Sequence, residues 1–288
     1  MLMLMLRPII SSLSPLLTTC RSAIQSTAMT VGEHATPTPH EADDRSIVWF
    51  DIDNTLYPAS ARINDLMKER IHAYFLSMGL AEDEASKMHK RYYTEYGLAL
   101  RGLVRHHKID ALDFDRKCDG SLPLDRVLKP DPAVRKLLED IDRSKTRVWA
   151  LTNAYSNHAY RVLKILKLDD LIERVAFCDY TKPDFSCKPE PQFYHDAMAY
   201  AKMKDPSKCF FVDDNLKNVQ SAKTLGWGSC VYFQEDPSVP ELVASGAQHP
   251  VALNTVEGVD ATITSLLGLR KVWPQLFKAP SCQQKDEL

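Results

Sequence analysis

The sequence predicts an α/β fold, in which a Rossmann-like parallel sheet core carries an α-helical cap inserted after the first strand. Short apolar runs rich in β-branched and aromatic residues alternate along the chain with segments of helical periodicity. This alternation is typical of a parallel sheet whose strands are joined by right-handed crossovers. The interval 59–128 breaks the alternation because it has helical periodicity but no strand-like run. It therefore indicates a separate helical insertion.

The expected strands are buried on both faces, because their apolar residues follow one another instead of alternating with polar ones. The first is 46–50, and it is followed by 147–151, a weaker candidate at 175–178, 209–212 and 229–233. Within the insertion, apolar residues recur at helical spacing over 62–78, and 82–96, 98–107 and 113–118 also have helical character. Pro130 and Pro132 mark the return to the sheet, with a helix expected at 133–141.

The domain organisation follows from these elements. Residues 46–58 and 129–270 form the sheet core, 59–128 form the cap, 1–45 form a leader and linker, and 271–288 form a C-terminal tail. Residues 1–32 contain arginine but no acidic residue, which is typical of a mitochondrial transit peptide. A disordered tail and a second start at Met29 are the alternatives. The last four residues are Lys-Asp-Glu-Leu, which is an ER retention sequence by its letters.

Composition excludes several classes of partner. The formal net charge of −2 gives no general attraction to nucleic acid, and no apolar stretch is long enough to span a bilayer. The 7 cysteines are dispersed, without CxxC pairs or histidines at zinc spacing, which indicates reduced thiols. We therefore expect a cytoplasmic protein, with mitochondria or the ER lumen as alternatives. The sequence indicates no oligomeric state.

Residues capable of chemistry follow the expected strands. In open parallel sheets ligands bind beyond the carboxyl ends of the strands, so the residues found there are the candidates for a site. Asp51 and Asp53 also point the same way, because side chains alternate along a strand with a period of two. In chain order the candidates are Asp51, Asp53, Thr152, Asn153, Lys188, Asp213 and Asp214.

Four carboxyl groups in this set would repel one another if the sheet brought them together. Such repulsion raises at least one carboxyl pKa unless a cation intervenes. A hard divalent cation with oxygen ligands relieves it, and Mg²⁺ suits carboxylates together with a phosphate oxygen. The sequence therefore predicts a Mg²⁺ site at the carboxyl edge of the sheet.

Four motifs in this order resemble those of the haloacid dehalogenase superfamily. They are Asp51-x-Asp53-x-Thr55, then Thr152, then Lys188, then Asp213-Asp214, and the resemblance extends over about residues 46–235. The chain is more similar still to the pyrimidine 5′-nucleotidase subfamily of fungi and plants. That similarity is carried by FDIDNTLYP at 50–58, YTEYGLALRGL at 93–103, LTNA at 151–154 and FVDDN at 211–215.

The resemblance implies a role for each motif residue. Asp51 would attack phosphorus and form an aspartyl phosphate. Asp53 would protonate the leaving oxygen and then deprotonate the hydrolytic water, and we expect its carboxylate neighbours to raise its pKa. Thr152 and Lys188 would hold the phosphoryl oxygens, and Asn153 would add a phosphate contact.

The resemblance also implies the ligands of the metal. Mg²⁺ would be bound by Asp51, the main-chain carbonyl of Asp53, and Asp213, with Asp214 acting directly or through water. An acid at the position of Asp53 favours phosphate chemistry, because a dehalogenase has no leaving group to protonate and usually lacks an acid there.

The cap is expected to determine which substrate is bound. Tyr93, Tyr96 and Arg101 could supply an aromatic stack and an arginine fork for a pyrimidine base. The alternative is that both tyrosines are cap core and Arg101 is solvated. The resemblance favours a role for Arg101 and leaves the tyrosines open. His158, in the helix after Thr152, is interpreted as a packing or surface residue.

The sequence thus predicts a phosphomonoesterase that acts on pyrimidine nucleoside 5′-monophosphates (UMP and CMP). One alternative substrate is another small phosphomonoester, such as a sugar phosphate, lysophosphatidate or phosphoglycolate. A second alternative, from a different class, is a regulatory binding protein that has kept the fold but lost catalysis. The presence of Asp51, Asp53 and Lys188 favours the enzyme.

Overall fold

The structure is a computed structural model that describes residues 43–235 and 256–279. All of them belong to one unit of the chain, Ala42–Leu288. The expected leader up to residue 42 and the Lys-Asp-Glu-Leu sequence at 285–288 lie outside the described residues.

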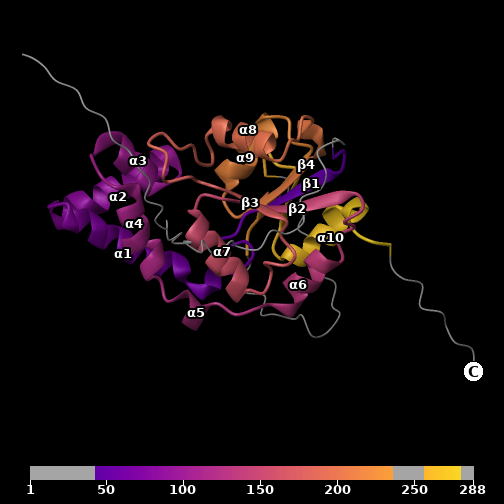
Figure 1. Ribbon diagram of the computed structural model, residues 1–288, viewed down its shortest axis with the longest axis horizontal. Coiled ribbons are helices and arrows are strands. Elements are labelled where there is room, and N and C mark those ends of the chain that lie inside the picture. Colours follow the sequence, from indigo (N-terminus) through magenta and orange to yellow (C-terminus); the bar gives the residue numbers. More distant parts are fainter. Residues whose placement is uncertain (1–42, 236–255, 280–288) are drawn as a thin grey trace, which may run out of the picture. The chain divides into compact units, whose positions relative to one another are not determined.

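A parallel sheet of six strands lies at the centre of this unit, in the order β3-β2-β1-β4-β5-β6 (Figure 1). The strands are β1 Ser46–Phe50, β2 Thr146–Thr152, β3 Arg174–Phe177, β4 Cys209–Asp213, β5 Ser229–Phe233 and β6 Ala261–Ile263. The first five confirm the predicted strands and the α/β fold. The sequence did not predict β6, because three residues are too few to show a period.

Helices cover both faces of the sheet, which explains why its strands are apolar throughout. On one face, Val48 and Phe50 pack with residues of α6 Pro132–Glu139 and α7 Ser156–Ile165. On the other face, Ile47 and Trp49 pack with α8 Pro191–Tyr200 and α9 Leu216–Thr224. Asp131 caps α6 by accepting a hydrogen bond from the Ala133 N–H at 2.7 Å. Short 3₁₀ turns, Pro206–Lys208 (η3) and Leu266–Gly268 (η5), complete the connections.

Every regular element between β1 and α6 is a helix or a 3₁₀ turn. These are η1 Ala59–Ala61, α1 Ile63–Ser77, α2 Glu82–Tyr96, α3 Ala99–His106, α4 Ala111–Lys117, η2 Asp119–Ser121 and α5 Leu124–Val127. Helices α1 to α4 lie beside one another and away from the strands (Figure 1). This matches the helical insertion expected from the sequence, and the domain boundaries at 59 and 128 stay a prediction.

The packed core extends beyond residue 270, where the sequence places the end of the sheet domain. After α10 Leu269–Val272, Trp273 and Leu276 are buried in the core, the latter in the 3₁₀ turn η6 Pro274–Leu276. The predicted start of a tail at residue 271 is therefore too early. The reason is that short turns show no hydrophobic period from which packing can be predicted.

Two further sequence expectations concern the described residues only. None of the helices in 43–235 and 256–279 has the length and apolar character needed to cross a bilayer. The cysteines in those ranges are free and buried, namely Cys118, Cys178, Cys187, Cys209 and Cys230.

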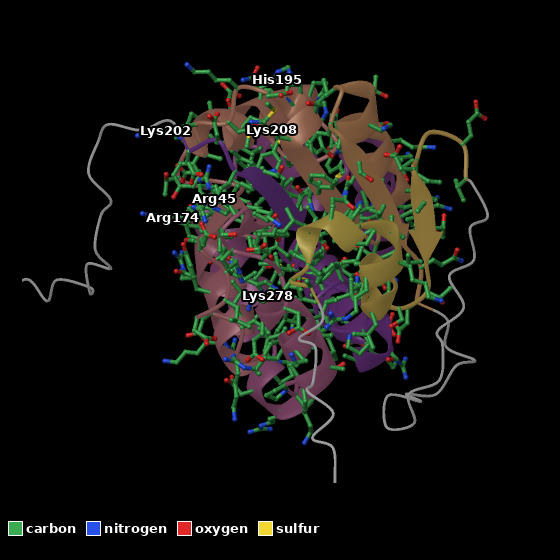
Figure 2. The ribbon with its side chains drawn as sticks, turned by 90° about the vertical axis from the view of Figure 1, so that its right-hand side faces the viewer. Arg45, Arg174, His195, Lys202, Lys208 and Lys278 are labelled. Atoms are coloured by element: carbon green, nitrogen blue, oxygen red, sulfur yellow. The ribbon has the colours of Figure 1, made fainter. Side chains whose placement is uncertain are left out.

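Basic side chains occur at the edge of the sheet where the strands begin. Arg45 directly precedes β1, Lys208 directly precedes β4, and Arg174 is the first residue of β3 (Figure 2). Arg45 pairs with Asp43 at 2.7 Å. Asp51, Asp213 and Asp214 lie at the opposite ends of these strands, where β1 and β4 finish.

Candidate active site

The carboxyl ends of β1 and β4 bring two acidic motifs together. The two strands are parallel neighbours, with Phe50 opposite Val212, so Asp51 and Asp213 emerge side by side. The chain crosses from β1 to β2 on one side and reaches β4 on the other, so the strand order changes direction at β1. Such a switch point is where open α/β sheets bind ligands.

Lys188 joins the two acidic motifs. Its Nζ donates to Asp51 Oδ1 and to Asp213 Oδ2, both at 2.6 Å, and to the Leu151 carbonyl at 2.7 Å. The side chain is buried. Burial alone would lower the pKa of Lys188, but the charges of Asp213 and Asp51 raise it above its ordinary value. Lys188 is therefore a fixed cation at the carboxyl edge of the sheet.

Asp51 is held by two partners, one on each oxygen. Besides Lys188 on Oδ1, the Thr55 hydroxyl donates to Oδ2 at 3.1 Å. Burial raises the pKa of Asp51 well above its ordinary value. Lys188 opposes that rise, and the nearby carboxylates Asp213 and Asp214 add to it. A positive charge beyond that of Lys188 would therefore favour the ionised nucleophile.

The donor set fits the Mg²⁺ ion that the sequence predicts. Asp51, Asp213 and Asp214 each offer a carboxylate oxygen, and these oxygens lie within 4.8 Å of one another. Burial, followed by the charge of Asp213, raises the pKa of Asp214 to about 7. Carboxylate oxygens crowded in this way suit a hard divalent cation. The Asp53 side chain turns elsewhere, so only its main-chain carbonyl could join them.

Asp213 is positioned by two asparagines. Its Oδ1 accepts the Asn215 N–H at 2.7 Å, and the Asn218 amide donates to both of its oxygens at 3.1 Å. Sequence analysis did not identify Asn218. Its position five residues after Asp213, in the first turn of α9, could have indicated it.

Thr152 and Asn153 have different surroundings. The Thr152 hydroxyl oxygen accepts the Ala154 N–H at 3.0 Å, and its own hydrogen has no acceptor among the residues that the structure describes, so it can reach a phosphoryl oxygen. Asn153, which we expected at the phosphate, instead holds the Lys188 backbone. Its Nδ2 donates to the Lys188 carbonyl at 2.9 Å, and its Oδ1 accepts the Lys188 N–H at 2.7 Å. The sequence cannot show this contact, because the partners are 35 residues apart.

Asp53 lies beside the nucleophile but has its own set of partners. Its Oδ1 accepts the Tyr57 hydroxyl at 2.8 Å and lies 2.7 Å from His158 Nε2. Burial alone would raise the pKa of Asp53, but the charge and hydrogen bond of His158 and the hydrogen bond of Tyr57 lower it overall. The expected increase in the pKa of Asp53 is therefore wrong, because the sequence did not reveal that His158 is its neighbour.

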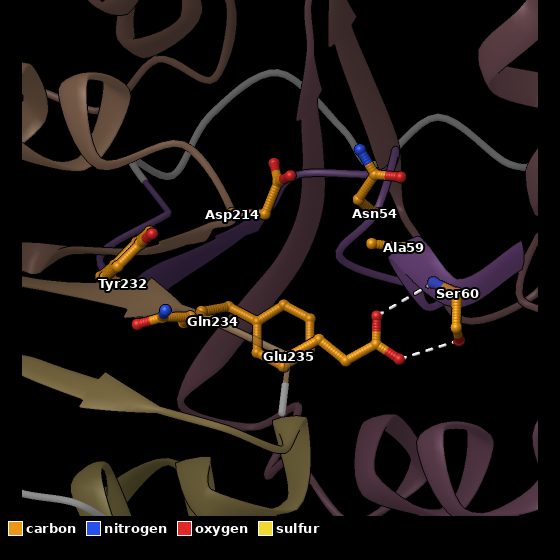
Figure 3. A pocket seen from close by; sticks show the side chains of 8 residues that line it. Asn54, Ala59, Ser60, Asp214, Tyr232, Gln234 and Glu235 are labelled. Atoms are coloured by element: carbon orange, nitrogen blue, oxygen red, sulfur yellow. Dashed lines mark hydrogen bonds between the residues drawn. The ribbon is translucent and has the colours of Figure 1, made fainter. Parts of the chain in front are cut away.

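A pocket of about 270 Å³ opens beside the acidic cluster. Asn54 and Asp214 line it at one end, and the Tyr232 hydroxyl points towards Asp214 (Figure 3). Glu235 closes the other end by accepting hydrogen bonds from the Ser60 N–H at 3.1 Å and from its hydroxyl at 2.9 Å. Of the acidic cluster, only Asp214 lines this pocket.

The two tyrosines expected at the substrate lie in different places. Tyr93 is half-exposed, and its hydroxyl lies by the Asn215 side chain, where burial and the charges of Asp214 and Asp213 raise its pKa. The Tyr96 hydroxyl oxygen instead lies 2.7 Å from His106 Nε2, within the helical insertion. The structure therefore brings Tyr93, but not Tyr96, to the acidic cluster.

Arg101 links the helical insertion to the loop that carries Lys188. It is buried and donates to both carboxylate oxygens of Glu190, through Nε at 2.8 Å and Nη2 at 3.2 Å. Gly97, at φ +75°, lets the backbone of the insertion lie close to the Lys188 loop. A Cβ at this position would lie 2.6 Å from the Lys188 carbonyl oxygen. Arg101 is therefore not solvated, and its guanidinium is already paired with a carboxylate.

Comparison with known proteins agrees with this geometry. Residues 46–226 match the model of the haloacid dehalogenase-like hydrolase family. Phosphate metabolism protein 8 of Saccharomyces cerevisiae is 38% identical over an alignment of 209 residues, which covers 69% of this chain and 64% of the yeast protein. The matched region thus spans less than two thirds of that relative's length.

Two solved structures show the same fold. A conserved haloacid dehalogenase-like protein from Agrobacterium tumefaciens has a TM-score of 0.50 and 16% identity, covering 80% of this chain and 98% of that one. CbbY from Rhodobacter sphaeroides, in complex with xylulose 1,5-bisphosphate, also has a TM-score of 0.50 and 16% identity, covering 77% and 94%. From its family match and from the acidic motifs gathered around Lys188, the chain belongs to the haloacid dehalogenase-like hydrolases.

Proposed function

We propose that this hydrolase is a Mg²⁺-dependent phosphomonoesterase that cleaves pyrimidine nucleoside 5′-monophosphates through an aspartyl phosphate on Asp51. The observation that carries the proposal is the contact of Lys188 Nζ with both Asp51 and Asp213 at 2.6 Å. This contact supports the roles proposed for the three residues, with Asp51 as nucleophile, Lys188 as a fixed cation and Asp213 as a metal ligand. The similarity to a yeast protein named for phosphate metabolism supports a phosphate ester as the substrate.

The first step transfers the phosphoryl group to the protein. An Asp51 carboxylate oxygen forms a bond to phosphorus while the bond from phosphorus to the ester oxygen breaks. Asp53 gives its proton to that departing oxygen, which leaves as an alcohol. The Lys188 ammonium and the free Thr152 hydroxyl hydrogen stabilise the phosphoryl oxygens during the transfer.

The second step returns Asp51 to its starting form. Asp53, now ionised, takes a proton from a water molecule as the water oxygen bonds to phosphorus and the bond to Asp51 breaks. Inorganic phosphate is the product, and Asp53 is again protonated. The lowered pKa of Asp53 keeps its carboxylate ionised before the water attacks, whereas the first step requires a proton to be bound to it when the substrate is in place. Both steps need Asp53 to face the reacting phosphorus.

Asp51, Asp213 and Asp214, with the Asp53 carbonyl, would hold Mg²⁺. Bound there, the ion supplies positive charge to the phosphoryl oxygens and to the crowded carboxylates. We expect chelation to abolish phosphate release. We also expect Mg²⁺ at about 100 times its Kd to raise the unfolding temperature by about 5–10 °C, because binding stabilises the folded state alone.

Thermal unfolding of matched variants checks the Mg²⁺ prediction. Asp214→Asn removes one negative charge from the proposed ligand set, so the temperature shift should shrink at the same Mg²⁺ concentration. Asp44→Asn, at a carboxylate that is 94% exposed and outside the proposed ligand set, should leave the shift unchanged. A shift equal in wild type and in Asp214→Asn would contradict the proposed ligand set.

The choice of substrate rests on the resemblance and on Tyr93. Its hydroxyl lies by Asn215, close enough to Asp214 and Asp213 to feel their charges, and its ring is half-exposed, so we propose that the ring stacks on the base. Phosphate release should be measured with UMP, CMP, AMP and GMP, and with sugar phosphate, lysophosphatidate and phosphoglycolate, each with and without Mg²⁺. The proposal predicts the highest kcat/KM for UMP or CMP. Equal turnover of unrelated phosphates would refute the nucleotide assignment.

Arg101 and Glu190 give a separate prediction. Because they pair across the insertion and the Lys188 loop, Arg101→Met should raise KM for nucleotide and non-nucleotide esters alike, and Glu190→Gln should do the same. In a double-mutant cycle the two changes should couple by about 0.5–3 kcal/mol. A loss confined to pyrimidine nucleotides in Arg101→Met alone would instead show that Arg101 contacts the base.

We propose the cytoplasm as the compartment. The buried, free cysteines of the described residues support a reducing environment. Imaging of the protein with an internal tag, leaving both ends free, tests this. Accumulation in mitochondria or in the ER lumen would contradict it.

A further inference from the structure

We propose that His158 is a positioning residue for the reaction, which fixes the carboxyl group of Asp53 so that one oxygen faces the leaving group. The inference rests on the proposed function, in which Asp53 protonates the departing oxygen. His158 is 3% exposed and lies in the first turn of α7, directly after the loop that follows Thr152 at the end of β2. Its Nε2 lies 2.7 Å from Asp53 Oδ1.

The hydrogen bonds to Asp53 are unequally divided between its two oxygens. Both Tyr57 and His158 bind Oδ1, at 2.8 and 2.7 Å. Across residues 43–235 and 256–279, no described hydrogen bond involves Oδ2. Two partners on one oxygen prevent rotation of the carboxyl group, and they leave the other oxygen free for the proton transfer. Tyr57 alone would let the group pivot about a single contact.

The far side of the imidazole ring faces the helical insertion. His158 Nδ1 is buried and has no hydrogen-bond partner within the described part of the chain, and it lies 3.8 Å from Asp119 Oδ1. Asp119 is buried and begins η2, directly after α4. His158 therefore stands between a carboxylate of the insertion and the proposed catalytic acid, and it connects the two parts of the chain at the reacting centre.

Positioning of this kind has a specific kinetic consequence. General acid catalysis matters most when the leaving oxygen is a poor leaving group, as in an alkyl ester, and it matters little for p-nitrophenolate, which departs without a proton. A misplaced Asp53 should therefore slow the cleavage of alkyl phosphates far more than that of p-nitrophenyl phosphate. A merely structural role for His158 would slow both equally.

The matched pair His158→Asn and His158→Gln tests the inference. Both replacements are polar amides that suit the same buried site, but only Gln is long enough to keep its donor near Asp53. Single-turnover release of the leaving group, uridine from UMP and p-nitrophenolate from p-nitrophenyl phosphate, should be measured, because it follows the first step alone. We expect His158→Asn to lose about 10²-fold with UMP and less than about 5-fold with p-nitrophenyl phosphate, and His158→Gln to recover most of the lost rate.

The controls separate the possible failures. Tyr160→Phe, on the same helix and 50% exposed, should match wild type with both substrates. Equal losses with both substrates in His158→Asn, or equal rates in the Asn and Gln variants, would overturn the positioning role. Absence of turnover with both substrates in wild type would instead refute the proposed function.

Discussion

Replacing Asp51 by Asn is expected to lower phosphate release by at least about 10⁴-fold, the largest effect that we predict for any single substitution. The amide cannot form the phosphoryl ester, so the covalent route is lost. The protein should still fold, because Lys188 retains Asp213 at 2.6 Å and the substitution removes a carboxylate from a crowded acidic group. Steady-state phosphate release and thermal unfolding, measured on the same preparation, check both expectations.

The same substitution separates the enzyme from a regulatory binding protein of this fold. If the cellular role requires catalysis, Asp51→Asn should behave as a loss of the protein. If a cellular effect of the protein is unchanged by Asp51→Asn, the binding role is favoured. A variant that retains more than about one hundredth of the wild-type rate would contradict Asp51 as nucleophile.

Replacing Lys188 by Met should reduce both activity and stability. The ammonium is buried between two carboxylates, and removal of one partner from such a group costs about 3–5 kcal/mol of unfolding free energy. Loss of the charge facing the phosphoryl oxygens should lower kcat by about 10²–10³-fold. Denaturant unfolding and kinetics with saturating Mg²⁺ measure the two effects.

Lys208→Met is the matched control for Lys188. Lys208 is a partly exposed lysine whose carboxylate partner Asp44 lies at 3.8 Å and is almost fully exposed. Its loss should change the unfolding free energy by no more than about 0.5 kcal/mol. Equal unfolding free energies of the two variants would show that the positive charge of Lys188 does not compensate the negative charges of Asp51 and Asp213.

The fold and the meeting of the acidic motifs could be predicted because parallel topology dictates both. Apolar runs buried on both faces identify the strands, and parallel strands end at the same edge of a sheet. Asp51 and Asp213 therefore had to approach each other, although 137 residues separate Asp51 from Lys188, the cation that joins them. No knowledge of side-chain packing is needed for that step.

The partners of each side chain could not be predicted in the same way. His158 and Arg101 each lie on a helix, and which residue a helical side chain meets depends on how the helix docks. The sequence therefore did not reveal that His158 reaches Asp53 or that Arg101 pairs with Glu190, 89 residues further along the chain. Asn153 shows the same limit, since its amide holds the Lys188 backbone.

Detection of the covalent intermediate is the most direct test of the proposed mechanism. Wild-type protein mixed with UMP and Mg²⁺ is quenched in acid within one turnover, digested, and analysed by peptide mass spectrometry. The account predicts one phosphoryl group on Asp51, present only when Mg²⁺ is supplied and absent from Asp51→Asn. Phosphate release by the wild type without any phosphoryl group on Asp51, or with one on a different residue, would contradict it.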